Sequence, residues 1–457
     1  MKRLLTERLE KWKNNPRRKP LLLLGARQVG KTWLMLDFGK QHYKQVAYVR
    51  FDRHERMRQL FEESSFDMHE MLVNMQTHVG FKITPGETLI ILDEIQECPA
   101  ALTSLKYFCE DLPEYHVMAA GSLLGVQLHE GTGFPVGKVN TMHLYPMRYR
   151  EFLLALGHEL DVEQLEKAAW GNIRLFSDRY AHLLRLYSYI GGMPEVVQAY
   201  VDTEDFCEVR EVQQEILSNY AQDFSKHVPK PLAAKLSLLW NSIPLQLARE
   251  NKRFLYKDVQ KGMRARDLED AMDWLQRAGL IYHTPRINEP AIPIGTYQDG
   301  AFKLYFLDVG LLGAKAGLTS SVLLEKTAVF REFKGALTEQ YVQQQLRAEC
   351  DIEPSYWQNE STRSEIDFVF QHDMNIVPVE VKAETNTRAK SLINYCRKYT
   401  PPVAIRCSMN DYATSQLTLS DESLTRLVDL PLYAVFLVTQ LLSPLLKDIT
   451  KCSAMKE

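Results

Sequence analysis

The residues with the clearest chemistry form the stretch GARQVGKT, at Gly25 to Thr32. They match the pattern G-x-x-x-x-G-K-[ST], and they lie between an apolar run and a predicted helix, as a phosphate-binding loop must. Its glycines let consecutive backbone N–H groups face phosphate oxygens, and the positive end of the helix adds to the attraction. Lys31 is expected to reach the β- and γ-phosphates, and the Thr32 hydroxyl to bind Mg²⁺. We therefore predict that ATP is held by Gly25, Ala26, Arg27, Gln28, Val29, Gly30, Lys31, Thr32 and Trp33.

A second set of chemical groups follows two later apolar segments. The segment TLIILDE ends in Asp93 and Glu94, which puts Asp93 at the carboxyl end of a predicted buried strand. A carboxylate at this position binds the Mg²⁺ of a phosphate-binding loop, and Glu94 is placed to orient and deprotonate the attacking water. Ser122 ends the apolar run HVMAAGS, and its hydroxyl is a candidate sensor of the γ-phosphate. The predicted catalytic residues are Lys31, Asp93, Glu94 and Ser122, and the predicted Mg²⁺ ligands are Thr32 and Asp93.

A separate constellation lies in the last third of the chain. Twelve residues separate Asp367, in a predicted strand, from a Glu-x-Lys at Glu380 and Lys382 in the next strand. Residues i and i+2 of a strand share a face, so Glu380 and Lys382 are expected to point together. A hairpin at 372–375 would bring Asp367 alongside, and Glu339 on a preceding helix would complete a Mg²⁺ shell, with Lys382 beside the hydrolytic water. The spacing resembles the PD-(D/E)-x-K nuclease core; the alternatives are a solvated Glu–Lys pair and a nuclease-like fold without activity.

The elements that must position these groups alternate between strand and helix in the first third of the chain. This alternation is typical of a parallel α/β sheet. Apolar runs predict strands at Leu21–Gly25, Val46–Asp52, Thr88–Glu94 and His116–Ser122, with a helix over 31–40. The runs are continuous rather than alternating, which predicts a sheet that is buried on both faces.

Later segments are mainly helical. The glycine pair Gly191-Gly192 breaks this pattern and is a candidate hinge. Residues 232–285 predict a compact helical unit that ends in an extended run, which is typical of a winged helix-turn-helix. Basic residues between Arg249 and Arg266 would suit DNA phosphates, although the helix that should read the groove is acidic. A DNA-binding module and a purely structural winged helix are both open at this point. The apolar stretch Leu432–Leu446 predicts a buried strand and a final turn.

The motifs follow one another in a definite order. They are GARQVGKT, ILDEIQ, AAGS, YPMRYREF (145–152), YIGGMPEVV (189–197) and FKLYFLDVGLL (302–312). In this order they resemble the AAA+-type ATPases with a C-terminal domain of unknown function. The resemblance implies an α/β fold with a P-loop AAA+-type core, a helical lid, a winged-helix segment and a tail similar to restriction-endonuclease-like folds. The expected boundaries are 1–155, 156–228, 229–295 and 296–457.

Two departures from that family bear on hydrolysis. Gly137-Lys138 stands where the family has Gly-Arg, and Pro146-Met147-Arg148 stands where it has a Pro-Leu-Ser turn. If the arginine supplies charge to a neighbouring subunit's active site, Lys138 does not reproduce its bidentate geometry.

The leading hypothesis is an enzyme, a Mg²⁺-dependent ATPase whose nucleotide state rearranges the winged-helix and nuclease-like parts, with DNA as a candidate partner. One alternative is a slow nucleotide-dependent switch that binds a protein partner or a second copy of itself, which Lys138 favours. The other is an ATP-gated, metal-dependent nuclease.

Composition narrows the class of protein. The chain has 457 residues, 45% hydrophobic and 25% charged, which excludes disordered and collagen-like classes. With 55 Lys and Arg against 58 Asp and Glu, the chain as a whole is not a basic wrapper for nucleic acid. Seven cysteines without a C-x-x-C pair indicate a reducing compartment, and we expect them as buried small side chains. A charged N-terminus and apolar runs shorter than about 20 residues predict a cytoplasmic protein without membrane contact.

Overall fold

The computed structural model describes residues 1–64, 66–121, 135–226, 228–249, 251–320, 331–359, 364–383, 389–418 and 424–454, without the side chains of 331–333 and 448–454. Contacts divide the chain into two compact units. The first comprises residues 1–146 and 273–280, and the second comprises residues 147–272 and 281–457.

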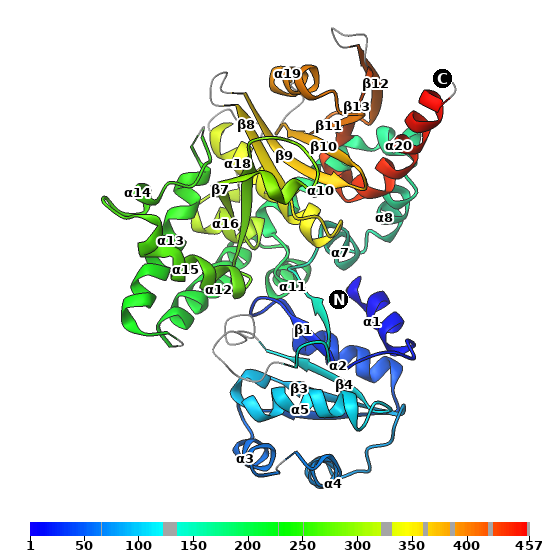
Figure 1. Ribbon diagram of the computed structural model, residues 1–457, viewed down its shortest axis with the longest axis vertical. Helices are drawn as coiled ribbons and strands as arrows, with labels where there is room; N and C mark the ends of the chain where they lie inside the picture. Colours follow the sequence, from blue (N-terminus) through cyan, green and yellow to red (C-terminus); the bar gives the residue numbers. More distant parts are fainter. Residues whose placement is uncertain are drawn as a thin grey trace. The chain divides into compact units, whose positions relative to one another are not determined.

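The first unit is built on a five-stranded parallel sheet with the order β2-β3-β4-β1-β5 (Figure 1). Four of these strands are the ones that the apolar runs predict. All six residues of β3 are buried, as expected for a strand covered on both faces. The strands are β1 Leu21–Leu24, β2 Gln45–Arg50, β3 Thr88–Asp93, β4 His116–Ala120 and β5 Asn140–His143.

Helices cover both faces of this sheet. Ile90 and Leu92 belong to a buried cluster that includes side chains of α3, α4 and α5. Leu89 faces α2, where its Cδ2 lies 3.2 Å from the position a Cβ would take on Gly39. Alternate side chains of one strand therefore fill two layers, which explains the continuous apolar run. The helices are α1 Leu5–Lys13, α2 Lys31–His42, α3 Glu55–Glu63, α4 Met68–Val79, the 3-10 helix η1 Ile95–Glu97 and α5 Pro99–Glu110.

The second unit begins with a helical region that includes the residues predicted as a lid. Pro194 starts α11 at a position where its missing N–H costs no hydrogen bond. The helices are α7 Tyr149–Ala155, α8 Glu159–Glu166, α9 Trp170–Leu175, α10 Ser177–Ile190, α11 Pro194–Thr203, α12 Phe206–Lys226, α13 Lys230–Leu247, α14 Tyr256–Val259 and α15 Ala265–Arg277. The residues of α15 from Asp273 onward belong to the first unit.

The glycine pair between α10 and α11 is packed too tightly to act as a free hinge. A Cβ on Gly192 would lie 2.1 Å from the carbonyl oxygen of Met147, and one on Gly191 would lie 2.1 Å from Asp308 Oδ2. The Gly192 N–H donates to Asp308 Oδ1 at 2.6 Å. The turn is thus held by packing on both sides, and close backbone approach is what requires glycine there.

A mixed eight-stranded sheet forms the rest of the second unit, in the order β12-β13-β11-β10-β9-β8-β6-β7. β6 pairs with β7 and also with β8, so the extended run predicted at the end of the winged-helix unit belongs to the C-terminal sheet. The boundary expected at 295/296 therefore falls between two paired strands. The strands are β6 Ile281–Ile287, β7 Gln298–Phe306, β8 Ser355–Asn359, β9 Ser364–His372, β10 Asn375–Val381, β11 Val403–Ser408, β12 Ala413–Thr418 and β13 Leu424–Pro431.

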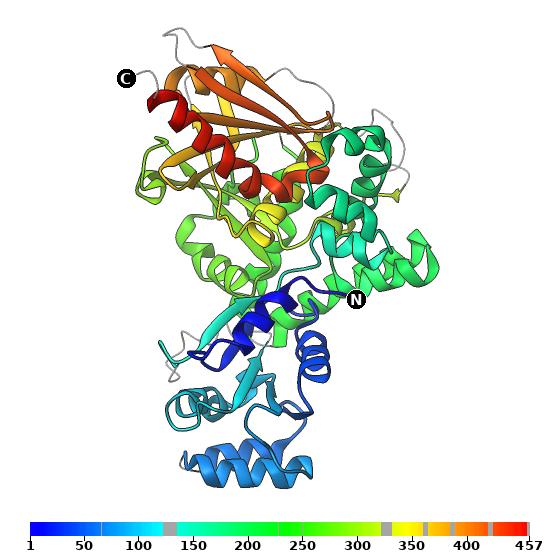
Figure 2. The same cartoon turned by 90° about the vertical axis from the view of Figure 1, so that its right-hand side faces the viewer.

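Helices pack on this sheet as well. Leu392 of α19 (Lys390–Tyr399) shares a buried cluster with residues of β8, β9 and β11, and α18 (Arg331–Ala348) contacts β7 and β10. The predicted strand within 432–446 is wrong, because residues Leu432–Leu437 form the 3-10 helix η4 and Val438–Ala454 form α20. Figure 2 shows α20 in red beside the strands of this sheet. Two further helices of the described residues are α16 Val309–Lys315 and the 3-10 helix η2 Ile294–Tyr297.

Two further expectations concern the cysteines and the membrane. Cys98, Cys396 and Cys407 are buried, as predicted, whereas Cys207 is exposed. Within the described part of the chain, no helix has the length and apolar character needed to cross a membrane.

Candidate functional site

The phosphate-binding loop connects β1 to α2 and has the backbone that the motif requires. Gly25 has φ +146°, and a Cβ there would lie 2.2 Å from the carbonyl oxygen of Leu144. Gly30 has φ +92° and caps the N-terminus of α2 in the left-handed region. Glycine is the residue that adopts both conformations without strain. The loop therefore aims the first N–H groups of α2 at the space where a phosphate would bind.

Lys31 is the first residue of α2 and folds back over the loop. Its Nζ donates to the carbonyl oxygens of Gly25 and Ala26, each at 2.8 Å. Burial lowers the pKa of Lys31 to about 8, although the charges of Glu94 and Asp93 oppose the shift. The ammonium is held by neutral groups, and it can exchange them for phosphate oxygens at little cost.

Asp93 lies at the end of β3 and is buried. Its Oδ2 accepts hydrogen bonds from the Thr32 hydroxyl at 2.8 Å and from the Tyr48 hydroxyl at 2.9 Å. Its Oδ1 accepts the Glu94 N–H at 3.1 Å. Burial raises the pKa of Asp93, while the hydrogen bonds from Thr32 and Tyr48 lower it. The carboxylate is thus held by neutral donors.

Glu94 follows directly in the left-handed conformation, with φ 49° and ψ 46°. Such a backbone is strained for a glutamate and is typical of functional positions. Gln96 Nε2 donates to Glu94 Oε2 at 2.6 Å and fixes the side chain. The predicted γ-phosphate sensor, Ser122, lies outside the described residues.

The other residues of the predicted ATP-binding stretch differ in their exposure to solvent. Ala26 and Val29 are buried and anchor the loop, whereas Arg27 and Trp33 are exposed. Gln28 adopts φ 66° and completes the turn.

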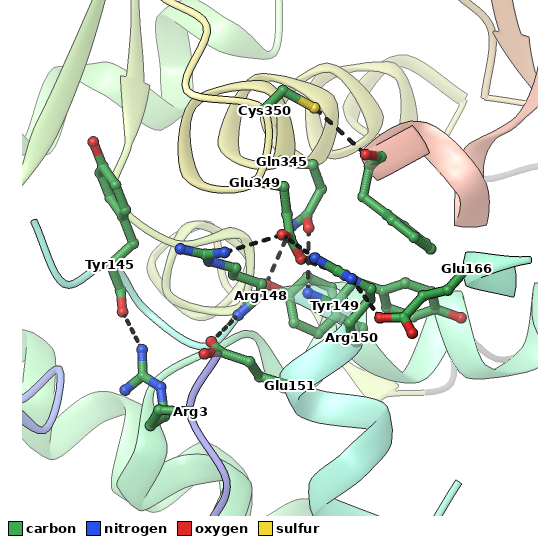
Figure 3. A network of polar contacts seen from close by, with 12 residues as sticks. Arg3, Tyr145, Arg148, Tyr149, Arg150, Glu151, Glu166, Gln345, Glu349 and Cys350 are labelled. Atoms are coloured by element: carbon green, nitrogen blue, oxygen red, sulfur yellow. Dashed lines mark hydrogen bonds and ion pairs between the residues drawn. The ribbon is translucent and has the colours of Figure 1, made fainter. Parts of the chain in front are cut away.

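Sequence reasoning missed two residues that hold this site. One is Tyr48. The other is Arg3, which is 4% exposed and donates to the carbonyl oxygens of Val29 at 2.8 Å and Tyr145 at 2.7 Å (Figure 3). An isolated arginine near the chain's N-terminus has no pattern that marks it, but Tyr48 could have been found from its strand register, two residues before the partner of Asp93.

The groups present fit Mg²⁺. This ion prefers oxygen ligands and usually keeps several waters beside one or two protein groups. Thr32 and Asp93 offer a hydroxyl and a carboxylate that already share a hydrogen bond. No ammonium pairs with Asp93 in the described residues, because Lys31 is bound to carbonyl oxygens.

The predicted nuclease-like residues lie in the second unit, and Lys382 links the fourth of them, Glu380, to the other three. Glu339, Asp367 and Lys382 interact electrostatically. Two lysines that sequence reasoning did not include complete the group, Lys252 and Lys303, and Lys252 forms an ion pair with Glu339.

Lys303 is the centre of this cluster. Its side chain is 0% exposed, and Nζ lies 2.5 Å from Glu365 Oε1 and 3.5 Å from Glu339 Oε2. The Tyr305 hydroxyl donates to Glu339 Oε2 at 3.2 Å. Burial alone would raise the pKa of Glu339, but Lys252 and Lys303 lower it to about 2. Burial and the charge of Glu339 raise the pKa of Asp367 to about 8.

The fourth predicted residue, Glu380, pairs with Lys382 and has a further partner in α19. The β9–β10 hairpin forms as predicted, but β9 carries an irregularity where it pairs with β8, opposite Ser355 to Trp357. The extra residue interrupts the alternation of β9, and Asp367 Oδ2 accepts the Val381 N–H of β10 at 2.7 Å. Glu380 Oε2 instead accepts the Leu392 N–H of α19 at 3.0 Å, and Lys382 Nζ lies 2.5 Å from Glu380 Oε1.

The predicted Mg²⁺ shell of Glu339, Asp367 and Glu380 is therefore not assembled. Over the described ranges, no three or more His, Cys, Asp or Glu side chains are grouped so that they could hold a metal ion. Lysine ammonium groups pair with Glu339 and Glu380 instead, and Asp367 accepts the Val381 N–H at 2.7 Å.

Two of the basic side chains considered for DNA contact form ion pairs within the chain. Arg249 pairs with Asp258 and Lys252 with Glu339. Lys138 is likewise paired within the first unit, with Nζ 2.8 Å from Glu110 Oε1.

A third polar network joins α7 to the end of α18 within the second unit (Figure 3). Glu349 is 1% exposed in its side chain and accepts from Arg148 at 3.1 Å and from Arg150 at 2.8 Å. Gln345 Oε1 accepts the Tyr149 N–H at 3.2 Å. Arg148, which departs from the family's Pro-Leu-Ser turn, therefore anchors the C-terminal region to the start of the helical region.

The parallel sheet and the loop geometry define the first unit as a P-loop nucleotide-binding ATPase domain. Comparison with protein families agrees, because residues 17–153 match the family described as "AAA domain". Residues 181–322 match "Domain of unknown function (DUF8612)" and residues 334–430 match "Domain of unknown function (DUF4143)". None of the curated proteins matches the chain.

Among solved structures, the chain is similar to a Walker-type ATPase of Pyrococcus abyssi, with 16% identity, a TM-score of 0.42, and coverage of 68% of this chain and 94% of that one. It is similar to Cdc6p of Pyrobaculum aerophilum (12% identity, TM-score 0.25, coverage 70% and 92%). It is also similar to the Orc1 protein of Aeropyrum pernix, solved in complex with DNA, with 13% identity, a TM-score of 0.28, and coverage of 68% of this chain and 90% of that one. These TM-scores are too low to support an argument about function.

Proposed function

We propose that this protein binds ATP with Mg²⁺ at the loop 25–32 and hydrolyses it. The observation that carries the proposal is the convergence of Lys31, Thr32 and Asp93 at the carboxyl edge of the parallel sheet, with Thr32 Oγ1 2.8 Å from Asp93 Oδ2. The match of residues 17–153 to an AAA domain supports a nucleotide-binding ATPase in general terms.

Each side chain has one role in this proposal. Lys31 exchanges the carbonyl oxygens of Gly25 and Ala26 for the β- and γ-phosphate oxygens. Thr32 and Asp93 hold Mg²⁺, which when bound neutralises charge on the phosphates. Glu94 accepts the proton of the attacking water, and Gln96 keeps its carboxylate oriented. Ser122 is proposed as the sensor of the γ-phosphate.

The test of catalysis is Glu94→Gln, with Glu97→Gln as the matched control. A general base contributes about 10²–10⁴-fold to a rate, so Glu94→Gln should lower steady-state ATP turnover by that range while ATP binding is kept. Glu97 is exposed on the neighbouring 3-10 helix, and its substitution should change neither quantity. Full turnover in the Glu94 variant would contradict the proposal, and negligible wild-type turnover with tight ATP binding would favour a nucleotide-dependent switch.

We propose further that the nucleotide state alters the arrangement of the second unit. The chain passes between the two units at 146/147, at 272/273 and at 280/281, so the units are joined by three covalent connections. Limited proteolysis of the full chain with ATP, with ADP and without nucleotide tests this, because a change in the cleavage pattern of the second unit is expected.

A further inference from the structure

We propose that Tyr48 is a positioning residue that holds Asp93 for the cation of the nucleotide and so determines how strongly ATP binding depends on Mg²⁺. This inference rests on the proposed function. No motif marks this tyrosine, and it lies outside the ATP-binding stretch. The argument depends on its place in the sheet and on the direction of one hydrogen bond.

The register between β2 and β3 places Tyr48 close enough to contact Asp93. β2 lies at the edge of the sheet beside β3, with Tyr48 opposite Ile91 and Arg50 opposite Asp93. Tyr48 is therefore one pleat before the partner of Asp93 and on the same face of the sheet. A phenol is long enough to cover this offset, and its hydroxyl lies 2.9 Å from Asp93 Oδ2.

The direction of the hydrogen bond decides what Tyr48 does. A carboxylate accepts only, so the phenol must donate its single proton to Asp93. A phenol is neutral at neutral pH, so Tyr48 donates to Asp93 without adding a charge. Together with the Thr32 hydroxyl it fixes Oδ2 in place without cancelling the negative charge.

To bind Mg²⁺, the Asp93 carboxylate must be held in position and must not be paired with a cation of the protein. Lys31 does not compete for it, because its Nζ is bound to Gly25 and Ala26. Without the Tyr48 hydroxyl, Asp93 would lose one of the two donors that hold Oδ2 in place. ATP without metal is bound by the loop N–H groups and Lys31, so its affinity should not depend on Tyr48.

The experiment measures ATP affinity of the full chain by calorimetry, once with Mg²⁺ and once with EDTA. The variant is Tyr48→Phe, which keeps the ring, and the control is Tyr107→Phe. The Tyr107 ring stacks on Phe66 with centroids 4.9 Å apart, and its hydroxyl has no hydrogen bond among the described residues. A hydrogen bond to a charged group corresponds to about tenfold or more in affinity.

We expect Tyr48→Phe to lower the ratio of Mg²⁺–ATP affinity to metal-free ATP affinity by about tenfold. The metal-free affinity should stay at the wild-type value, and Tyr107→Phe should change neither. An unchanged ratio in Tyr48→Phe, or an equal loss in both arms, would overturn the inference alone. Wild-type protein that binds no ATP in either arm would overturn the proposed function and this inference with it.

Discussion

The P-loop site and the cluster around Lys303 use the same residue types and pair them in opposite ways. At the P-loop, the buried Asp93 is held by two hydroxyls, and Lys31 is held by two carbonyl oxygens. In the cluster around Lys303, the ammonium groups of Lys252 and Lys303 form ion pairs with glutamates. Lys252 pairs with Glu339, and Lys303 pairs with Glu339 and Glu365. The first site keeps its charges available for an anion and a cation from outside, whereas the second neutralises its charges internally.

This difference shows that a list of Asp, Glu and Lys residues does not define a metal site. Removing a charge from water costs several kcal/mol, which a partner must offset. In the second unit the partners are lysines of the chain itself. In the first unit, neutral donors hold the carboxylate, and the remaining stabilisation can come from a ligand.

The largest expected effect in the second unit is the loss of Lys303. Lys303→Met should lower the free energy of unfolding by about 3–5 kcal/mol, because it leaves the buried Glu339 and the nearby Glu365 with fewer cations. Lys31→Met is the matched comparison, since it should abolish ATP binding and destabilise the protein much less.

The free energy of unfolding of each variant is measured by urea unfolding of the full chain, with and without Mg²⁺–ATP. Ligand binding stabilises only the unit that binds, so the transition that ATP does not shift reports on the second unit. If Lys303→Met leaves the urea midpoint of that transition unchanged, Lys303 does not stabilise the second unit and the contrast drawn between the two sites is wrong.

A smaller effect is expected from pH, through Asp367. Its pKa is raised to about 8 in the folded protein, above the unfolded value, so the folded state binds the extra proton. The resulting stability is fully present below about pH 4 and is lost as the pH rises toward 8, with a slope of at most about 1.4 kcal/mol per pH unit.

Asp367→Asn mimics the protonated acid and should flatten this slope between pH 4 and 8. Asp373→Asn, on the exposed β9–β10 turn, is the control and should keep the slope. Urea unfolding at several pH values decides the matter, and a wild-type slope in Asp367→Asn would show that Asp367 is ionised in the folded protein.

The smallest effect is expected at Lys138. Because Lys138 is paired with Glu110 on the surface of its own unit, Lys138→Ala should leave ATP turnover unchanged at every protein concentration. A concentration-dependent fall in turnover would instead show that Lys138 acts on a neighbouring subunit, in the way the family's arginine is expected to.

Most of the ATP site was predictable because its chemistry is local. A strand, a glycine loop and a helix follow one another within residues 21–42, and Asp93 ends a strand that is apolar throughout. Strand order brings them together in any parallel sheet of this kind. Tyr48 and Arg3 were not predictable, because each acts through a contact with a distant segment and neither belongs to a motif.

The second site was less predictable because its pairing is not local. Asp367 accepts the Val381 N–H and Glu380 pairs with Lys382, and no residue type in SEIDFVF predicts these separate partners. Lys252 comes from a basic segment for which DNA contact was left open, and Lys303 from a strand that the expected boundaries place in the C-terminal domain. Both pair with Glu339 of α18.

The sequence by itself determined the elements and the phosphate-binding loop, because hydrophobic period and glycine geometry act over a few residues. Tertiary structure alone decided which charges face one another. Two carboxylates separated by the same number of residues can share an ion or meet two lysines, and their pKa values and chemistry depend on those neighbours. For this protein, tertiary structure separates the proposed Mg²⁺–ATP site from a cluster in which lysines of the chain itself pair with the glutamates.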